Sequence, residues 1–470
     1  MAATYTSLRQ AWLALSGLSV VFLVEMLDNS LLTLALPAIA RDTGAAPAAL
    51  QWVQGSYSLV LGGLMILLGV LADRAGRRRT MLLGLLLLAL ASLATLGVHT
   101  VAALIAVRCL MGLAAAMTAP GAMSLAFRLF TEDEQRVRAI NLISTVGLVG
   151  LAAGPVVGGA VLAVLPWRSL LVVNAPLALL AWVGIRCGVA PDDPAEAHRE
   201  PLDILGAVLG TGALVLLLLA PSLLVHDGVG SPLVWIAAVG GVAAMAGFVA
   251  RQRRTEHPLI PLSLLATPLV GAGLLFKAAT GLATAGLGYL VTLQLQLVWG
   301  FPPVLAAVAM APQVLVLLAG GALLTPLVRR VGMSTAAVIG AVAVVAGLAV
   351  EASLGFSGYP ALAVALALVA VGQRIVGVVA GTNVMKGLPE SRTTLGAALV
   401  DTASEVSTGV GVAVAGTLVA AFVSGSFGAV VSGAQRAQLV SGVTVAAVVL
   451  TVASAVLVGW GFLRASSSVR

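Results

Sequence analysis

The sequence predicts an all-α protein that crosses a membrane about fourteen times. Of its 470 residues, 60% are hydrophobic and only 9% are charged, and the mean hydropathy is +1.10. A soluble protein of this length would need a much larger polar surface, so lipid must surround most of the chain. These observations indicate a polytopic membrane protein.

Long apolar segments alternate with charged or Pro/Gly-rich joints along the whole chain. A helix needs roughly 20 mostly apolar residues to cross a bilayer, and each segment is long enough for one crossing. The first segment is expected to be retained, because no short apolar stretch with a small-residue cleavage site precedes it. The predicted spans are 12–38, 50–72, 80–98, 101–125, 138–164, 168–188, 203–224, 232–250, 268–293, 303–327, 334–353, 359–384, 394–422 and 440–463.

The basic residues are concentrated in one set of alternate joints, which predicts that both termini are cytoplasmic. The opposite joints hold only Arg41, Arg168 and Arg436. Because the basic residues are confined to short loops without interleaved aromatic residues, the net charge of +7 does not indicate nucleic-acid binding. The basic residues of the predicted cytoplasmic joints are Arg9, Arg74, Arg77, Arg78, Arg79, Arg128, Arg136, Arg138, Arg186, Arg199, Arg251, Arg253, Arg254, Arg329, Arg330, Lys386, Arg392, Arg464 and Arg470.

The longest polar stretches flank the seventh and eighth spans and divide the chain into three parts. The prediction is an N-terminal six-helix bundle over 1–190, a central linker with two extra transmembrane helices over 191–267, and a C-terminal six-helix bundle over 268–470. A faint repeat supports this division, since "LADRAGRR" after the second span has a counterpart in "LVRRVGMS" after the tenth. Parallel repeated halves are a known transporter architecture.

A few ionisable side chains fall inside the predicted spans. An ionisable group in lipid is costly, so such groups are expected to face the protein interior or a wet cavity and to mark a working site. The residues concerned are Glu25, Asp28, Arg108, Lys277, Arg374, Asp401 and Glu405.

The acids form two pairs, each on one face of its helix. Glu25 and Asp28 are three residues apart, and the pair in the thirteenth span is four residues apart. Two carboxylates close together in a low-dielectric cavity cannot both ionise cheaply, so such a pair can carry a proton. Asp28 and Arg108 are expected at similar depths, which makes an ion pair geometrically possible.

Asp401 and Glu405 are expected at the depth of Lys277 and, approximately, of Arg374. Pairing between these acids and bases would cancel charge within the C-terminal half. The alternative for Lys277 and Arg374 is a structural role, in which their ion pairs only hold helices together.

The fifth span contains a glycine-rich face in "GLVGLAAGPVVGGAVL". Gly150, Gly154 and Gly158 recur every four residues, Gly159 follows, and Pro155 removes a backbone donor. Small residues at this spacing let two helices come close together, and proline bends a helix. Ordinary membrane packing is the alternative interpretation.

Four stretches resemble the major facilitator superfamily and, within it, the fourteen-helix drug/proton antiporter branch. "LDNSLLTLALPAI" resembles the first-helix signature of that branch, and "GVLADRAGRRRT" resembles the cytoplasmic loop between helices two and three. "LIAVRCLMGLAAA" is similar to the fourth-helix pattern with its arginine, here Arg108, and "GLAAGPVVGG" to the fifth-helix antiporter motif. The resemblance covers essentially the whole chain and implies the major facilitator fold with two additional central helices.

"LVDTASEVSTGVGVAVAGTL" also resembles the thirteenth helix of exporters for lipophilic cations, which carries two acids at a similar spacing. Buried bases could instead repel organic cations or accept an anionic group, which leaves a zwitterionic or acidic substrate open, such as an antibiotic or a metabolite of the producing cell. The candidate proton-coupling residues are Glu25, Asp28, Arg108, Asp401 and Glu405. The candidate substrate-binding residues are Glu25, Asp28, Lys277, Arg374, Asp401 and Glu405.

Asp73 lies among arginines at the cytoplasmic end of the second span. There it can meet a neighbouring arginine and the positive N-terminus of a helix from the other bundle. By the resemblance, that helix begins near Thr393 and Thr394, and the contact joins the bundles on the inside when the outside is open. The predicted conformational gate consists of Gly69, Asp73, Arg74, Gly76 and Arg77.

The resulting hypothesis is a drug/proton antiporter in the cell (inner or plasma) membrane, which exports lipophilic cationic or zwitterionic molecules by alternating access. The proton gradient takes the place of a cofactor, and a monomer is the default expectation. One alternative is a dedicated exporter of one metabolite or antibiotic, and another is a monovalent-cation/proton antiporter. A membrane enzyme is disfavoured because the sequence contains no metal-ligand cluster, phosphate-binding loop or Ser/His/Asp grouping.

Overall fold

The computed structural model describes residues 5–130, 132–192, 203–388, 393–423 and 431–466. Nearly all of these residues are helical, and the described ranges contain no β-strand. Within these described residues, thirteen helices are long and apolar enough to cross a membrane, or fourteen if one bent pair is counted as a span. The predicted all-α membrane architecture is therefore confirmed.

The helices fall into three groups along the chain. The first comprises α1 (Trp12–Thr43), α2 (Pro47–Ala75), α3 (Arg77–Ala94), α4 (Val101–Arg128), α5 (Asp133–Val164), α6 (Arg168–Val172) and α7 (Asn174–Gly188). The central pair is α8 (Ile204–Asp227) and α9 (Pro232–Arg254). The last comprises α10 (Leu262–Ala266), α11 (Pro268–Leu293), the π-helical η3 (Gln294–Val298), α12 (Pro303–Ala309), α13 (Ala311–Val331), α14 (Met333–Leu354), the 3-10 turn η4 (Gly355–Ser357), α15 (Tyr359–Lys386), α16 (Thr393–Phe422) and α17 (Gly433–Ser466).

Two of the predicted spans are broken into shorter helices. The tenth span bends by 42° between α12 and α13. Pro312 lies in the first turn of α13, where it cannot donate a backbone hydrogen bond, and this explains a bend at that point. The sixth span is interrupted near Val173, between α6 and α7.

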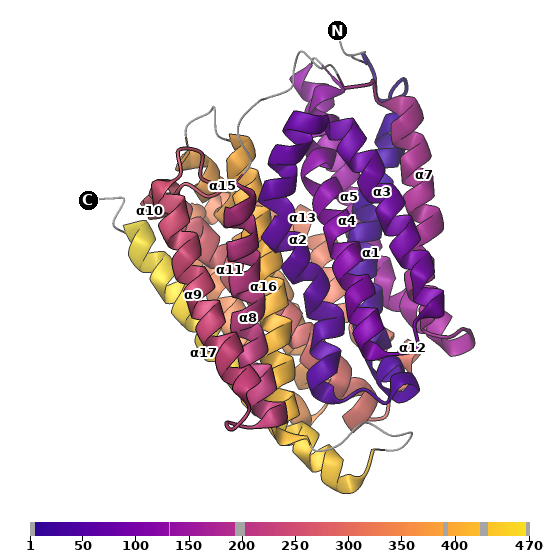
Figure 1. The fold of residues 1–470 in the computed structure, drawn as a ribbon, viewed down its shortest axis with the longest axis vertical. Helices are drawn as coiled ribbons and strands as arrows, with labels where there is room; N and C mark the ends of the chain where they lie inside the picture. Colours follow the sequence, from indigo (N-terminus) through magenta and orange to yellow (C-terminus); the bar gives the residue numbers. More distant parts are fainter. Residues whose placement is uncertain (1–4, 131, 193–202, 389–392, 424–430, 467–470) are drawn as a thin grey trace.

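The first described residues before α1 and the C-terminal end of α17 lie on the same side of the molecule, in the upper half of Figure 1. We call this side the termini end and the opposite side the distal end. Helices α1 to α7 contact one another and form one bundle, and α11 to α17 form a second bundle. The two bundles meet along α2 and α16 on one side and along α5, α12 and α13 on the other.

The glycine face of α5 packs against α1. A Cβ atom at Gly150 would lie 2.8 Å from the carbonyl oxygen of Leu23, so only glycine allows this approach. Pro155 cannot donate to the carbonyl of Leu151 one turn earlier, and the Ser30 hydroxyl of α1 donates to that oxygen instead, at 3.2 Å. The helix–helix contact and the proline are thus parts of one arrangement.

The α8–α9 hairpin lies across the seam between the bundles, because α8 contacts both α2 and α16. Thr211 of α8 fits directly against Gly63 of α2. At the termini end, Asp203 caps α8 through the Gly206 amide and accepts hydrogen bonds from Arg251 (2.9 Å) and Gln252 (3.0 Å) of α9. The hairpin is therefore fixed at its base as well as along its length.

Burial by itself raises the pKa of Asp203, but the hydrogen bonds from Gly206, Arg251 and Gln252 outweigh burial and lower the pKa below its ordinary value. A carboxylate of this kind stabilises the fold above its ordinary pKa of about 3.9 and loses this contribution as the pH falls through the depressed value.

We expect Asp203→Asn to lower the thermal stability of the purified protein at neutral pH by about 1 to 3 kcal/mol, since charge-assisted hydrogen bonds are lost. The difference from wild type should shrink as the pH falls toward 3. Thermal unfolding in detergent at several pH values measures both effects. Glu134→Gln is the matched control, because Glu134 is 71% exposed in its ion pair with Arg138. A constant difference at all pH values would contradict the role of Asp203.

Candidate functional site

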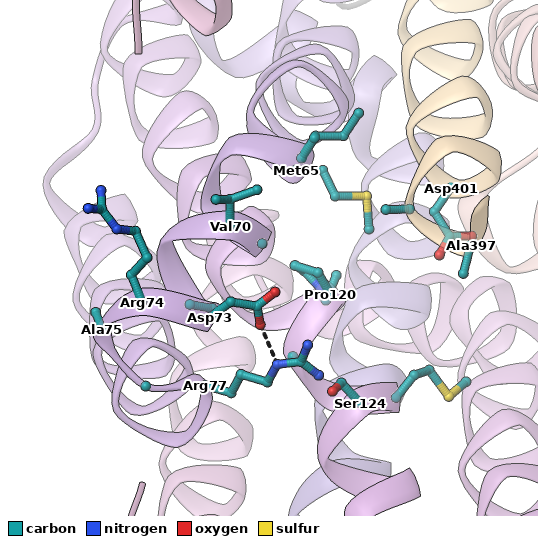
Figure 2. A pocket seen from close by; sticks show the side chains of 18 of the residues that line it. Met65, Val70, Asp73, Arg74, Ala75, Arg77, Pro120, Ser124, Ala397 and Asp401 are labelled. Carbon is teal, nitrogen blue, oxygen red and sulfur yellow. Dashed lines mark hydrogen bonds and ion pairs between the residues drawn. The ribbon is translucent and has the colours of Figure 1, made fainter. Parts of the chain in front are cut away.

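A cavity of about 1910 Å³ lies between the two bundles and extends from the termini end to the middle of the helices. Its walls come from α1, α2 and α4 on one side and from α11 and α16 on the other. Figure 2 shows Asp73 and Arg77 on one wall of this cavity and Asp401 of α16 facing it. The loop residues 256–259 before α10 also line its mouth.

Four of the predicted site residues meet at the deep end of the cavity. Glu25 of α1, Lys277 of α11, and Asp401 and Glu405 of α16 all line it. Glu25 is close enough to both acids of α16 to interact electrostatically with them, and Lys277 likewise acts on Asp401 and Glu405. Gly62 of α2 makes room for the backbone of α16 beside Glu405. The cavity therefore ends in an acidic cluster that includes one lysine.

Arg374 does not belong to this cluster, so the predicted pairing with the acids of α16 is wrong. Its side chain lies against α13, where a Cβ atom at Gly320 would be 3.0 Å from the Cγ of Arg374. The prediction rested on depth along α15, whereas the side chain of Arg374 is directed toward Gly320 and Gly321 within the C-terminal bundle. Lys277 also forms no ion pair within 4.0 Å among the described residues and faces the cavity as an available cation.

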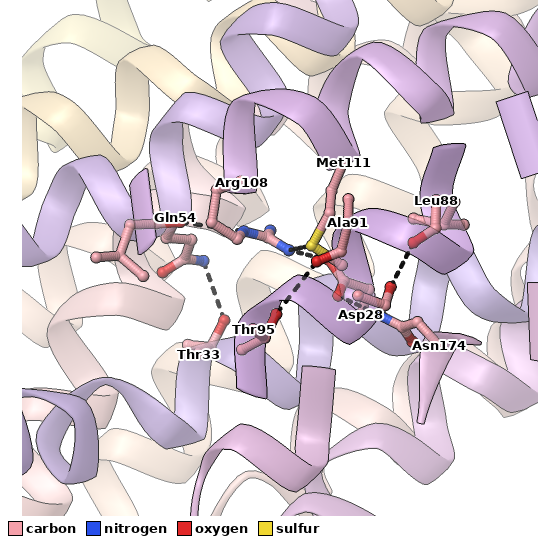
Figure 3. Close-up of polar contacts among 11 residues, drawn as sticks. Asp28, Thr33, Gln54, Leu88, Ala91, Thr95, Arg108, Met111 and Asn174 are labelled. Atoms are coloured by element: carbon pink, nitrogen blue, oxygen red, sulfur yellow. Dashed lines mark hydrogen bonds and ion pairs between the residues drawn. The ribbon is translucent and has the colours of Figure 1, made fainter. Parts of the chain in front are cut away.

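Asp28 forms the predicted ion pair with Arg108, at 2.5 Å, inside the N-terminal bundle (Figure 3). Asn174 of α7 donates a second hydrogen bond to the other carboxylate oxygen, also at 2.5 Å. Arg108 is 0% exposed, donates to the carbonyl of Val53 at 3.2 Å, and lies over the ring of Tyr57 at 4.5 Å. Asp28 is thus compensated by fixed partners and does not line the large cavity.

A void of about 10 Å³ lies between Asp28 and Glu25, and Tyr57 and Thr118 are also part of its wall. This volume corresponds to about one water molecule. Asn174 was not among the residues selected from the sequence. The signal was present, since a single asparagine interrupts the apolar run "LLVVNAPLALL", but an amide carries no charge and did not stand out.

The predicted gate residues surround the mouth of the cavity. Asp73 pairs with Arg77 at 2.5 Å, one turn further along the chain. Asp192 accepts hydrogen bonds from the amides of Arg78 and Arg79 and so caps α3. Gly76 has a φ of +101° and contacts Asp192 so closely that no side chain would fit.

Of the other predicted gate residues, Gly69 lies beside Pro120 of α4 and Arg74 is exposed at the mouth. The side chains of Thr393 and Thr394, the predicted partners of Asp73, lie outside the described part of the structure.

The distal end is closed by contacts between the bundles. Gln51 of α2 accepts a hydrogen bond from Thr417 of α16 at 3.0 Å and donates one to Ser222 of α8 at 2.9 Å. Gln296 of η3 donates to the carbonyl of Leu34 in α1 at 3.0 Å. We call these contacts the distal seal. The structure is therefore open at the termini end and sealed at the distal end.

Residues 18–412 match the family model of the Major Facilitator Superfamily. The chain belongs to the Major Facilitator Superfamily.

Among solved structures, a transporter of the POT family, PepTSo, is similar over 98% of this chain and 99% of its own, with a TM-score of 0.69 at 14% identity. A bacterial homologue of the human lysosomal transporter Spinster, in an inward-facing conformation, gives a TM-score of 0.65 at 17% identity, over 97% of both chains. At these identities the likeness establishes the fold alone.

Curated relatives are more similar in sequence. The cephamycin export protein of Amycolatopsis lactamdurans is 37% identical over 66% of this chain, and the match spans 64% of that protein's own length. The puromycin resistance protein of Streptomyces alboniger is 35% identical over 72% of this chain and 67% of its own. A multidrug efflux pump of Mycolicibacterium smegmatis is 30% identical over 88% of this chain and 82% of its own.

We expect Asn174→Leu to destabilise the N-terminal bundle by about 1 to 3 kcal/mol, because Asp28 would keep only one of its two buried partners. A lower unfolding temperature of the purified protein would show this. Asn141→Leu serves as the control, since Asn141 is exposed. If both variants unfold at the same temperature, the hydrogen bond between Asn174 and Asp28 does not contribute to stability.

Proposed function

We propose that this protein is a proton-driven exporter of lipophilic cationic or zwitterionic small molecules in the cell membrane. The observation that carries the proposal is the cluster of Glu25, Asp401 and Glu405 with Lys277 at the blind end of a cavity between two bundles. The relatives are named for cephamycin export, puromycin resistance and multidrug efflux, and this supports export of such compounds.

The distribution of arginine and lysine supports a cytoplasmic position of the termini end. With this orientation, the cavity is open to the cytoplasm and the distal seal faces the outside. Substrate would then enter from the cytoplasm and reach the acidic cluster directly.

The charges at the blind end supply a basis for antiport. With all three acids ionised and Lys277 protonated, the cluster carries a net negative charge, which favours a cation. A cation that binds the ionised acids opposes their protonation, and by reciprocity protonation weakens cation binding. Glu25, Asp401 and Glu405 are therefore proposed to exchange substrate for protons.

Asp28 and Arg108 are proposed to take part in coupling indirectly. Their pair is already satisfied, but the water-sized void places Asp28 next to Glu25. A change of charge on Glu25 would be felt by the pair across this void, because the surrounding dielectric constant is low.

The proposal divides the chain into the bundles 1–190 and 268–470, joined by the segment 191–267. The contacts within α1 to α7 and within α11 to α17 support this division. Gly159 of α5 touches Pro303 and Val304 of α12, so the antiporter motif reaches the other bundle near the distal end. Asp73, here paired with Arg77, is proposed to bind α16 only when the cavity mouth closes.

A dedicated exporter of one compound is the second candidate function. The relatives that support it are named for single compounds, such as the lincomycin resistance protein of Streptomyces lincolnensis, 32% identical over 71% of this chain and 68% of its own. Competition among many compounds for one transport process would separate a multidrug exporter from a dedicated one.

We expect the double change Asp401→Asn and Glu405→Gln to reduce transport of a lipophilic cation about tenfold or more, because a charged partner of the substrate is lost. Uptake of a fluorescent cation into energised inside-out vesicles measures this effect. Glu134→Gln should transport normally, since Glu134 lies on the exposed end of α5. Unchanged uptake by the double variant, at equal expression, would refute the proposed role of the α16 acids.

Lys277→Gln is expected to change substrate preference and not simply to inactivate the protein. Lys277 acts on Asp401 and Glu405 as an internal cation, so its removal should strengthen binding of monocations several-fold. The same change should weaken binding of zwitterions, which lose a partner for their anionic group. Binding measurements on the purified variant with one compound of each class test this, and parallel changes in both classes would argue against it.

A further inference from the structure

Glu351 is a buried carboxyl group that the proposed transport mechanism does not use. It lies near the distal end of α14, three residues before that helix ends at Leu354, and is 1% exposed. Neither of its carboxyl oxygens has a hydrogen-bond partner among the described residues. An ionisable group in such a position is costly unless it has a function.

Glu351 and Gln294 reach the same backbone residue, Gly355 of η4. A Cβ atom at Gly355 would lie 2.7 Å from the carboxyl carbon of Glu351. The side-chain amide of Gln294 in η3 donates a hydrogen bond to the carbonyl oxygen of Gly355, at 2.8 Å. Gln294 is 0% exposed, and its own amide oxygen receives no hydrogen bond from the described residues.

Three buried oxygen atoms near Gly355 have no hydrogen-bond donor among the described residues: both carboxyl oxygens of Glu351 and the amide oxygen of Gln294. A buried carboxylate without a donor or counter-charge is strongly unfavourable, whereas a neutral carboxylic acid supplies one O–H donor. The amide oxygen of Gln294 is an acceptor of the kind that this donor requires. The missing component is therefore a proton.

The charged residues of the helices that contact α14 are all at other positions along those helices. Lys277 is in the cavity, Arg374 lies against α13, and Arg436 is exposed at the start of α17. The remaining charged residues of these helices, at their termini ends, are Arg329, Arg330, Lys386 and Arg464. Among the described residues, no charged group forms a hydrogen bond or ion pair with the Glu351 carboxyl.

The same π-helical segment takes part in the distal seal. Gln294 points toward Gly355 inside the C-terminal bundle, while Gln296, two residues later, donates to the carbonyl of Leu34 in the other bundle. Short π-helical segments are uncommon and frequently occur at functional sites. A change at Glu351 can thus reach α1 through one short segment.

We propose that Glu351 and Gln294 form a proton-binding site that controls the distal seal. Protonated Glu351 donates to the amide oxygen of Gln294, which fixes η3 so that Gln296 holds α1. Loss of the proton to the medium at the distal end leaves an anion that requires water, and separation of η3 from α1 admits that water. This inference rests on the part of the proposed function that concerns alternating access. It does not require any particular class of exported compound.

The test follows the distance between the bundles at the distal end as a function of pH. Spin labels are attached to Val164→Cys in α5 and Leu305→Cys in α12, both exposed positions, after Cys109 and Cys187 have been replaced. All samples carry Glu25→Gln, Asp401→Asn and Glu405→Gln, so that the proposed substrate site does not titrate.

With Glu351 present, the distal distance should lengthen as the pH rises from about 5 to about 9. Glu351→Gln keeps a donor for Gln294 but cannot ionise, so its distance should stay short at every pH. Glu134→Gln is the matched control and should behave like the parent. A pH-dependent distance that persists in Glu351→Gln would overturn the proposal, as would a pH-independent distance in the parent.

Two further measurements test the proposal without the Glu351→Gln variant. Infrared spectroscopy of the parent should show a protonated-carboxyl C=O band at neutral pH, and a spectrum without this band would overturn the proposal. Gln294→Met removes the acceptor of the protonated form, so the midpoint of distal opening should fall by about one pH unit. An unchanged midpoint would overturn the assigned hydrogen bond. Because the substrate acids are absent throughout, these outcomes are independent of the export proposal.

Discussion

The ion pair between Asp28 and Arg108 is the interaction on which the N-terminal bundle depends. Each partner would be prohibitively costly alone in an apolar interior, and breaking such a buried pair costs about 3 to 5 kcal/mol. Asn174 completes the carboxylate and Tyr57 covers the guanidinium, so α1, α2, α4 and α7 are joined at one point. The bundle can then move as a rigid unit against its partner.

Charge inside the helical region is handled in three different ways. Asp28 has fixed partners, while Glu25, Asp401 and Glu405 line a large cavity that is open at the termini end. Glu351 has no hydrogen-bond partner among the described residues and is almost fully buried. Only groups of the second kind are suited to exchange a bulky ligand, and this difference separates the proposed substrate site from the proposed control site.

Much of the architecture was predictable because lipid imposes a length and a polarity on every span. Depth along a helix follows from counting residues, and this correctly brought Asp28 to the level of Arg108. Direction around the helix axis depends on how helices pack, which one sequence does not reveal. For this reason Arg374 was expected near the acids of α16 but faces α13. Glu351 was overlooked because it lies close to the end of its predicted span, where a carboxylate could have reached water.

The position of the α8–α9 hairpin has a consequence for the route by which a hydrophobic compound reaches the cavity. Many lipophilic molecules partition into the bilayer and would approach a transporter sideways, through a gap between its halves. On the α2–α16 side, α8 contacts both helices, and the residues that follow α9 extend across the cavity mouth. A molecule that diffuses within the membrane is therefore blocked on the α2–α16 side. The hairpin restricts lateral entry from the lipid to the opposite side, between α5 and the α12–α13 pair.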